Sequence, residues 1–272
     1  MATANDAQAR AAAAYNAAAD RYDDPANSFW ERFGGATIAR LRPEPGWRIL
    51  DVCCGSGASA LPAAAAVGPQ GSVLGIDLAE NLLDLARRKA AARALRNTEF
   101  RRGDMLDMHL GDTKFDAVVC VFGIFFVPDM AAAARALWDA VRPGGKLAVT
   151  TWGPRFFEPA TAAFWDAIRE ERPDLYRGFN PWDRICDPDS LRALLREAGI
   201  PRADVLAEAG EHAIPSPEAW WSAVLGSGYR GTLEHLDIAA RERVRDANLA
   251  YIRTSGVRSV EANVVFAIAR KD

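Results

Sequence analysis

One stretch near the start of the chain, residues 48–59, constrains the fold more than any other. An apolar run at 49–53 is typical of a buried parallel strand, and an alanine-rich segment at 58–67 is typical of a helix. Gly55 and Gly57 lie in the turn between them, where a ligand can approach bare backbone near a helix N-terminus. Asp51 ends the strand at the carboxyl edge, where open α/β sheets bind ligands. The stretch therefore predicts a nucleotide-type site on an α/β sheet.

Two cofactors fit this turn. Gly55, Gly57 and Ala60 match the G-x-G-x-x-G/A dinucleotide fingerprint. Asp51 and the same glycines also match the acidic-x-Gly-x-Gly-x-Gly motif of class I S-adenosylmethionine (SAM) methyltransferases, with Cys53 in place of the first glycine. The acid favours SAM, because a carboxylate repels a pyrophosphate and attracts a sulfonium amino acid that has a free amine. Cys53 is small, so we expect a local adjustment of the turn rather than loss of the site.

Composition excludes several classes of protein. The 272 residues are 50% hydrophobic and carry a formal net charge of -3 without a basic block, which argues against nucleic acid or an anionic membrane as a partner. The four cysteines show neither C-x-x-C nor metal-ligand spacing, so we expect a reducing cytoplasm and no metal. Asp6, Arg10 and Asp20 interrupt the N-terminus, unlike a signal peptide. The longest apolar run, 117–127, is too short to cross a membrane. No pattern indicates an oligomeric state.

Two further acids follow predicted strands. The run at 72–77 ends in Asp77 and leads into a predicted helix at 79–91. Asp77 either bridges two ribose hydroxyls or caps that helix, and its position after the glycine turn favours ribose. A third strand at 98–102 leads into Gly103, Asp104 and Met105. Asp104 can accept a hydrogen bond from an adenine amino group, or it is an ordinary turn residue.

The middle of the chain continues the alternation of strands and helices. A fourth strand is predicted at 115–121, a helix at 130–141 and a fifth strand at 147–152. The loop between the fourth strand and the helix, 122–129, is almost entirely apolar. Such a loop at the ligand edge either fills the core or forms the floor of an apolar substrate pocket.

In this order the motifs resemble a known family. They read Ile-Leu-Asp-Val-Cys-Cys-Gly-Ser-Gly from 49, Gly-Ile-Asp from 75, Gly-Asp-Met from 103, Phe-Asp-Ala-Val-Val from 115 and Arg-Pro-Gly-Gly from 142. Over residues 49–152 the chain resembles class I SAM-dependent methyltransferases, and it looks most like the branch of quinone-biosynthesis C-methyltransferases and small-molecule methyltransferases. The resemblance implies a Rossmann-like α/β fold with a seven-stranded sheet whose last strand is antiparallel.

The resemblance also implies roles for individual residues. Asp51 and the glycine turn would hold the methionine part of SAM, Asp77 the ribose, and Asp104 with Met105 the adenine. The complete set that we expect at the cofactor is Tyr15, Tyr22, Asp51, Cys53, Gly55, Gly57, Asp77, Leu78, Leu82, Gly103, Asp104, Met105, Val121 and Phe126.

The rest of the chain is predicted to belong to the same single domain, 1–272. Residues 1–35 would form an N-terminal cap that includes a helix at 7–22, with Tyr15 and Tyr22 on one face. That face either packs into the core or closes over the ligand. Two insertions, 154–186 and 211–256, are rich in aromatic residues or helix-forming sequence. They are lids that select the substrate, or else scaffold or a dimer surface.

These observations predict a SAM-dependent methyltransferase, in which a small apolar or aromatic acceptor attacks the methyl group in line and S-adenosylhomocysteine (SAH) is released. Phe125, Trp152 and Trp221 are candidate acceptor-binding residues. His212 and Tyr22 are candidate bases for an acceptor that carries a proton, although lone histidines are usually structural. An NAD-dependent oxidoreductase and a non-catalytic SAM-binding protein remain alternatives at this stage.

Overall fold

A seven-stranded sheet forms the centre of the computed structural model, which describes residues 4–272. Its strand order is β3-β2-β1-β4-β5-β9-β6; the first five strands run parallel, and β9 is antiparallel to both β5 and β6. The strands are β1 (Arg48–Val52), β2 (Ser72–Asp77), β3 (Thr98–Arg102), β4 (Phe115–Val121), β5 (Val141–Trp152), β6 (Asp204–Glu208) and β9 (Val264–Arg270). The seven-stranded sheet with an antiparallel last strand confirms the predicted fold class.

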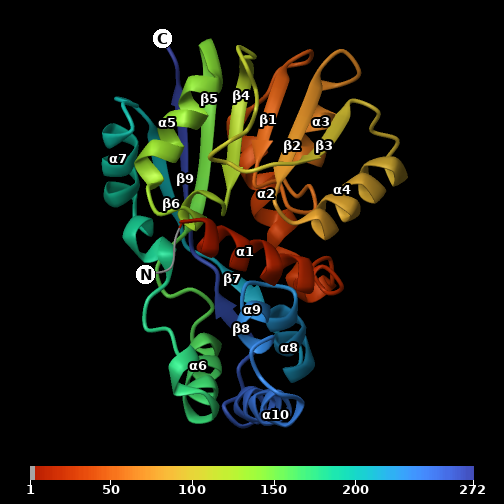
Figure 1. The fold of residues 1–272 in the computed structure, drawn as a ribbon, viewed down its shortest axis with the longest axis vertical. Helices are drawn as coiled ribbons and strands as arrows, with labels where there is room; N and C mark the ends of the chain where they lie inside the picture. The colour runs from red at the N-terminus through yellow and green to blue at the C-terminus, as the bar shows by residue number, and fades with distance from the viewer. Residues whose placement is uncertain (1–3) are drawn as a thin grey trace.

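Helices cover both faces of this sheet (Figure 1). One face carries α2 (Phe29–Leu41), α3 (Ala60–Val67) and α4 (Glu80–Ala92), and the other carries α5 (Met130–Ala140) and α7 (Pro188–Glu197). The central strand β1 pairs with β2 and β4 and is buried from Ile49 to Val52, because its side chains face a helical layer on either side. The layers therefore enclose one apolar core on each face of the sheet.

The remaining helices lie beyond the carboxyl ends of the parallel strands, at the lower end of the sheet in Figure 1. Helix α1 (Ala4–Ala18) crosses this edge and packs against α4 and α9. Below it lie α6 (Ala160–Glu171), α8 (Pro217–Leu225), α9 (Arg230–Leu233) and α10 (Ile238–Thr254). A small second sheet, formed by β7 (Glu211–Ala213) and β8 (Ser259–Glu261), joins these helices to β9.

Most element boundaries agree with the sequence patterns to within two residues, but β5 is an exception. The predicted strand at 147–152 starts earlier, at Val141, and so includes the Pro143–Gly145 turn. This turn produces a shift in the register between β4 and β5, where Phe115 pairs with Val141 and Ala117 with Lys146. The small β7–β8 sheet was not predicted, because strands of three residues carry almost no periodic signal.

The N-terminal helix, predicted at 7–22, begins and ends earlier in the chain, at Ala4–Ala18. It ends at Ala18, so Tyr22 lies in the following turn rather than on the same helical face as Tyr15. The residues that follow do not favour an α-helix, because Pro25 disfavours a helical conformation for Asp24. The Asp24 side chain instead accepts a hydrogen bond from the Ala26 N–H and caps a 3-10 helix at Pro25–Asn27.

None of the helices described for residues 4–272 is long and apolar enough to span a bilayer.

Candidate functional site

A pocket lies at the carboxyl edge of the sheet, between the strand ends and helix α1. It contains about 870 Å³ of space free of protein atoms, its opening to solvent included. Its walls come from the glycine turn, the ends of β2 to β4, and the N-terminal segment. The lining residues are Gln8, Ala11, Ala12, Tyr15, Tyr22, Trp30, Cys53, Cys54, Gly55, Ala58, Ser59, Ile76, Asp77, Leu78, Ala79, Leu82, Gly103, Asp104, Met105, Val121, Phe122, Phe126 and Val127.

The glycine turn accommodates Cys53 in a left-handed backbone conformation. Cys53 adopts φ 60°, a left-handed conformation that glycine adopts more readily than other residues, so this position stores local strain. Gly55 also has positive φ, at 52°, and a Cβ atom there would lie 3.2 Å from Tyr22 Oη. Glycine at 55 therefore keeps open the space between the turn and Tyr22. The expected local adjustment at Cys53 takes this form.

Asp77 connects β2 to the turn. Its Oδ2 accepts a hydrogen bond from the Gly55 N–H at 2.9 Å, and its Oδ1 accepts one from the Ala79 N–H at 2.8 Å. Burial raises the pKa of Asp77, while these backbone donors act in the opposite direction. Each carboxylate oxygen can accept more than one hydrogen bond, so Asp77 can hold the turn and still receive a ligand hydroxyl. The N-cap of α4 is Ala79, so the capping alternative for Asp77 is wrong, and its role in ligand binding stays a prediction.

Asp51 lies behind the turn, at only 1% exposure, and does not itself line the pocket. Its Oδ2 accepts a hydrogen bond from the hydroxyl of Ser59 at 2.7 Å, whereas its Oδ1 is buried without a hydrogen-bond partner. Burial raises the pKa of Asp51 to about 7, against the effect of the Ser59 hydroxyl. A buried acceptor without a partner next to a ligand pocket is suited to a cationic group.

The pKa of Asp51 predicts how stability depends on pH. Because the folded-state pKa lies above the unfolded value, the native protein holds the proton more tightly, and its stability falls as pH rises from about 4 to about 7. Asp51→Asn removes this loss. At pH 8 and without ligand, the free energy of unfolding of the variant should exceed that of the wild type by about 2–4 kcal/mol, since one pKa unit corresponds to about 1.4 kcal/mol. Denaturant unfolding at pH 5 and pH 8 measures the difference, with the exposed Asp112→Asn as control. Equal pH dependence in wild type and Asp51→Asn would contradict it.

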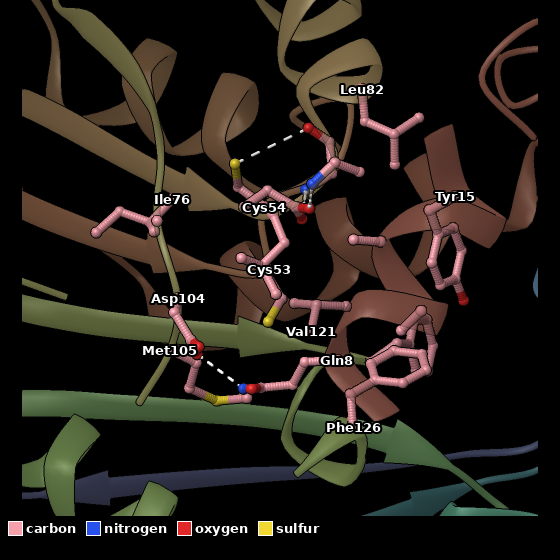
Figure 2. Close-up of a pocket in the computed structure, with 18 of the residues that line it drawn as sticks. Gln8, Tyr15, Cys53, Cys54, Ile76, Leu82, Asp104, Met105, Val121 and Phe126 are labelled. Atoms are coloured by element: carbon pink, nitrogen blue, oxygen red, sulfur yellow. Dashed lines mark hydrogen bonds between the residues drawn. The ribbon is translucent and has the colours of Figure 1, made fainter. Parts of the chain in front are cut away.

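Asp104 is hydrogen-bonded to a side chain of the N-terminal helix. Its Oδ1 accepts hydrogen bonds from Gln8 Nε2 and from the Leu106 N–H, each at 2.8 Å. Figure 2 shows Gln8 reaching Asp104 and Met105 from helix α1. Gln8 is 5% exposed, so this hydrogen bond brings the start of α1 down onto the loop after β3. The polar acceptor predicted at Asp104 therefore faces both the pocket and the helix that covers it.

Aromatic side chains form the opposite wall. Tyr22 stacks on Trp30 with ring centroids 5.1 Å apart, and Tyr15 meets Phe126 edge to face at 5.7 Å. Burial raises the pKa of Tyr15 and of Tyr22 well above the usual value. Both hydroxyls therefore stay protonated and act as hydrogen-bond donors near neutral pH. Tyr22, a candidate base from the sequence, is better suited to donating a proton in a hydrogen bond than to removing one.

Most of the residues predicted to contact the cofactor meet at this pocket. Asp51 and Gly57 are the two that do not line it; Gly57, with φ 86°, shapes the turn from behind. The residues predicted there that do line it are Tyr15, Tyr22, Cys53, Gly55, Asp77, Leu78, Leu82, Gly103, Asp104, Met105, Val121 and Phe126.

The predicted acceptor-binding residues lie outside the pocket lining. Trp152 is buried and stacks on Phe122 at 3.9 Å, so it supports the wall from behind. Phe125 is buried beside Phe126 and faces Trp182 rather than the pocket. Trp221 lies on α8, away from the sheet edge.

His212 is not brought into the pocket either. Its Nε2 donates a hydrogen bond to the carbonyl oxygen of Ala26 at 2.8 Å, and its ring meets Phe29 edge to face at 5.0 Å. Burial lowers its pKa, so the imidazole stays neutral. His212 therefore joins the β7–β8 sheet to the N-terminal segment and has no contact with the ligand region. The alternative role of a structural histidine describes it better than that of a base.

Several pocket residues were missed by sequence reasoning. Gln8 lies in an alanine-rich helix without any motif, and no motif marks Trp30 either. Ser59 could have been predicted from the sequence. A hydroxyl at the start of the helix after the glycine turn can reach the end of the preceding strand, where Asp51 lies.

Comparison with known proteins decides between the cofactors that the turn alone left open. Residues 49–145 match the family model described as a methyltransferase domain. The demethylmenaquinone methyltransferase of Listeria monocytogenes serotype 4a (strain HCC23) is 36% identical over 112 residues, which cover 41% of this chain and 47% of that protein. Residues 49–145 of the chain form a methyltransferase domain. A methyltransferase domain favours SAM over NAD as the cofactor of the glycine turn.

The fold of the methyltransferase domain is also found in solved structures. A SAM-dependent methyltransferase from Aquifex aeolicus superposes with a TM-score of 0.52 and 21% identity, over 68% of this chain and 88% of that one. The YcgJ protein from Bacillus subtilis superposes with a TM-score of 0.56 and 16% identity, over 88% of this chain and 98% of that one. At these identities the likeness concerns the fold. The chain spans about half the length of the curated relatives it matches.

Proposed function

We propose that this protein transfers the methyl group of SAM to a small apolar or aromatic acceptor by direct in-line attack. The observation that carries this proposal is the single pocket in which the glycine turn, Asp77 and Asp104 meet an aromatic wall. The pocket then has a polar half that suits a nucleoside, next to an apolar half that suits an acceptor. The demethylmenaquinone methyltransferases among its relatives support a small-molecule acceptor.

The polar half fits SAM. The buried, unpartnered Oδ1 of Asp51 is suited to the cationic amine of the methionine part, and a Cβ at Gly55 would narrow the space that this part needs. In this proposal Asp77 receives the ribose hydroxyls, while Asp104 and Met105 receive the adenine. Bound SAM supplies an electrophilic methyl group on its sulfonium, so the chain has only to bind, orient and exclude water.

The apolar half supports the class of acceptor. Among the described residues that line the pocket, none is a lysine, arginine or histidine, so no cation matches a phosphate or carboxylate on the acceptor. Trp30, Phe122 and Phe126 instead present aromatic surface. Tyr15 and Tyr22 keep their protons and can donate hydrogen bonds to an acceptor oxygen. An acceptor that is already nucleophilic when it binds suits these residues best.

We further propose that residues 1–272 act as one methyltransferase domain in which 1–35 form a cap. In the described chain the insertions 154–186 and 211–256 contribute no residue to the pocket lining. The second insertion instead packs against the outer side of the cap. Trp30 Nε1 donates to the Gly226 carbonyl at 3.3 Å, and Asn27 Nδ2 donates to the Ser222 carbonyl at 3.2 Å. The four cysteines are free thiols, which supports a cytoplasmic location.

The proposed reaction is tested with SAM carrying a labelled methyl group and a panel of quinols, phenols and neutral amines. We expect label in at least one apolar acceptor, with SAH formed in equal amount. Tight binding of SAM with no transfer to any acceptor of these classes would favour the non-catalytic alternative. Transfer confined to phosphate- or carboxylate-bearing acceptors would overturn the proposed acceptor class.

Chelation provides an independent test. In residues 4–272, no group of three or more histidine, cysteine, aspartate or glutamate side chains could hold a metal ion. The rate of methyl transfer should therefore be the same with and without EDTA. A rate that falls with EDTA and returns on addition of Mg²⁺ or Zn²⁺ would contradict this expectation.

A further inference from the structure

A polar cluster outside the pocket joins the N-terminal cap to the glycine turn. The hydroxyl of Ser56, between the two turn glycines, donates a hydrogen bond to Asp23 Oδ1 at 2.8 Å. Lys89 Nζ, from helix α4, donates to the same Asp23 oxygen at 2.9 Å and to Ser56 Oγ at 3.1 Å. The three side chains form a closed triangle across three segments that are distant in the sequence.

This triangle is only partly shielded from solvent, because the Asp23 side chain is 32% exposed. Ser56 is 1% exposed and the Lys89 side chain is 18% exposed. Because Ser56 and Lys89 are more buried than Asp23, water screens this cluster less than a fully exposed pair, and each charge has a hydrogen-bond partner. Lys89 also lies 3.2 Å from Glu31 Oε1, which gives it a second contact with the N-terminal segment, at the start of α2.

The position of Asp23 connects this cluster to the pocket. Asp23 directly follows Tyr22, whose hydroxyl oxygen lies 3.2 Å from the place of a Cβ on Gly55. Ser56 directly follows Gly55, whose N–H is held by Asp77. A contact between Asp23 and Ser56 therefore fixes Tyr22 over the same turn that Asp77 holds from below.

We propose that Asp23, Ser56 and Lys89 are positioning residues that hold the cap over bound SAM. The inference rests on the proposed function, because it gives the cluster its effect through cofactor binding. The cluster touches neither cofactor nor acceptor, and it acts through Tyr22 and helix α1. Without it, the cap loses its only charged attachment to the glycine turn within the described residues, and bound SAM is released faster.

Lys89→Met tests the proposal, because methionine keeps an unbranched apolar side chain and removes the charge. We expect an SAH dissociation constant about 5- to 50-fold higher, as for the loss of a charge-assisted hydrogen bond. Asp23→Asn should have a similar effect, and Lys89→Arg should stay within about threefold of the wild type. The matched control is Arg88→Met, an exposed neighbour on the same helix, which should leave SAH binding unchanged.

Hydrogen exchange gives a second measurement that needs no ligand. In Lys89→Met the amides of α1 should exchange faster while those of β1 and β4 keep their protection. Unchanged SAH affinity and unchanged α1 exchange would overturn the positioning role. Faster exchange throughout the sheet would also overturn it, since that result indicates general destabilisation. A wild type that binds no SAH would instead overturn the proposed function, and this inference with it.

Discussion

Deletion of residues 1–24 should leave a folded protein that binds SAM about tenfold or more weakly and transfers little methyl group. Five residues of the pocket lining lie in this segment: Gln8, Ala11, Ala12, Tyr15 and Tyr22. The strands of the sheet lie in later residues, and of the segment only Tyr22 belongs to the two clusters of buried core residues, so the fold should survive with a lower melting temperature. Thermal melting with and without SAM, on both proteins, measures the effect. A ligand-induced shift of equal size in both would reject closure by the cap.

A point substitution avoids the exposed surface that the deletion creates. Tyr15→Ala keeps α1 and removes the ring that meets Phe126 edge to face, so it should weaken SAM binding in the same direction. Ala9→Ser, on the exposed side of the same helix, is the matched control and should bind SAM like the wild type. If Tyr15→Ala binds SAM with the affinity of the wild type and transfers methyl groups at the same rate, α1 has a purely structural role.

Asp77→Ala should weaken SAM binding by about 1.5–3 kcal/mol, the scale of hydrogen bonds to a charged group. The fold should survive, because Asp77 ends β2 rather than lying within it. Part of the loss will come from the turn, since Asp77 also holds the Gly55 N–H. Asp77→Asn keeps one oxygen and separates the two contributions. Titration calorimetry measures the affinities, with exposed Asp112→Ala as control. Unchanged affinity in Asp77→Ala would remove the ribose assignment.

The parts of the site that follow from local sequence could be predicted. The end of a strand and the turn after it lie at the carboxyl edge of a parallel sheet, so Gly55, Asp77 and Asp104 had to come together once their strands were paired. The antiparallel last strand followed from the resemblance, not from the residues themselves. Tyr22 lies at the pocket as predicted, although α1 ends at Ala18 and Tyr22 belongs to the turn that follows it.

Contacts between distant segments could not be predicted. Gln8 meets Asp104 across 96 residues of sequence, and His212 meets Ala26 across 186. No periodicity or motif encodes such pairs, because they depend on how α1 and the β7–β8 sheet pack against the rest of the molecule. This is why His212, which could be a base on residue type alone, is a structural residue. It is also why Gln8 was missed.

Titration of the wild-type protein with SAH and, separately, with NADH tests the central claim most directly. The account predicts that SAH binds at a single site per chain, that Asp77→Asn weakens this binding, and that NADH produces no heat of binding. Saturable binding of NADH that Asp77→Asn weakens, with no binding of SAH, would contradict the assignment of the pocket to SAM.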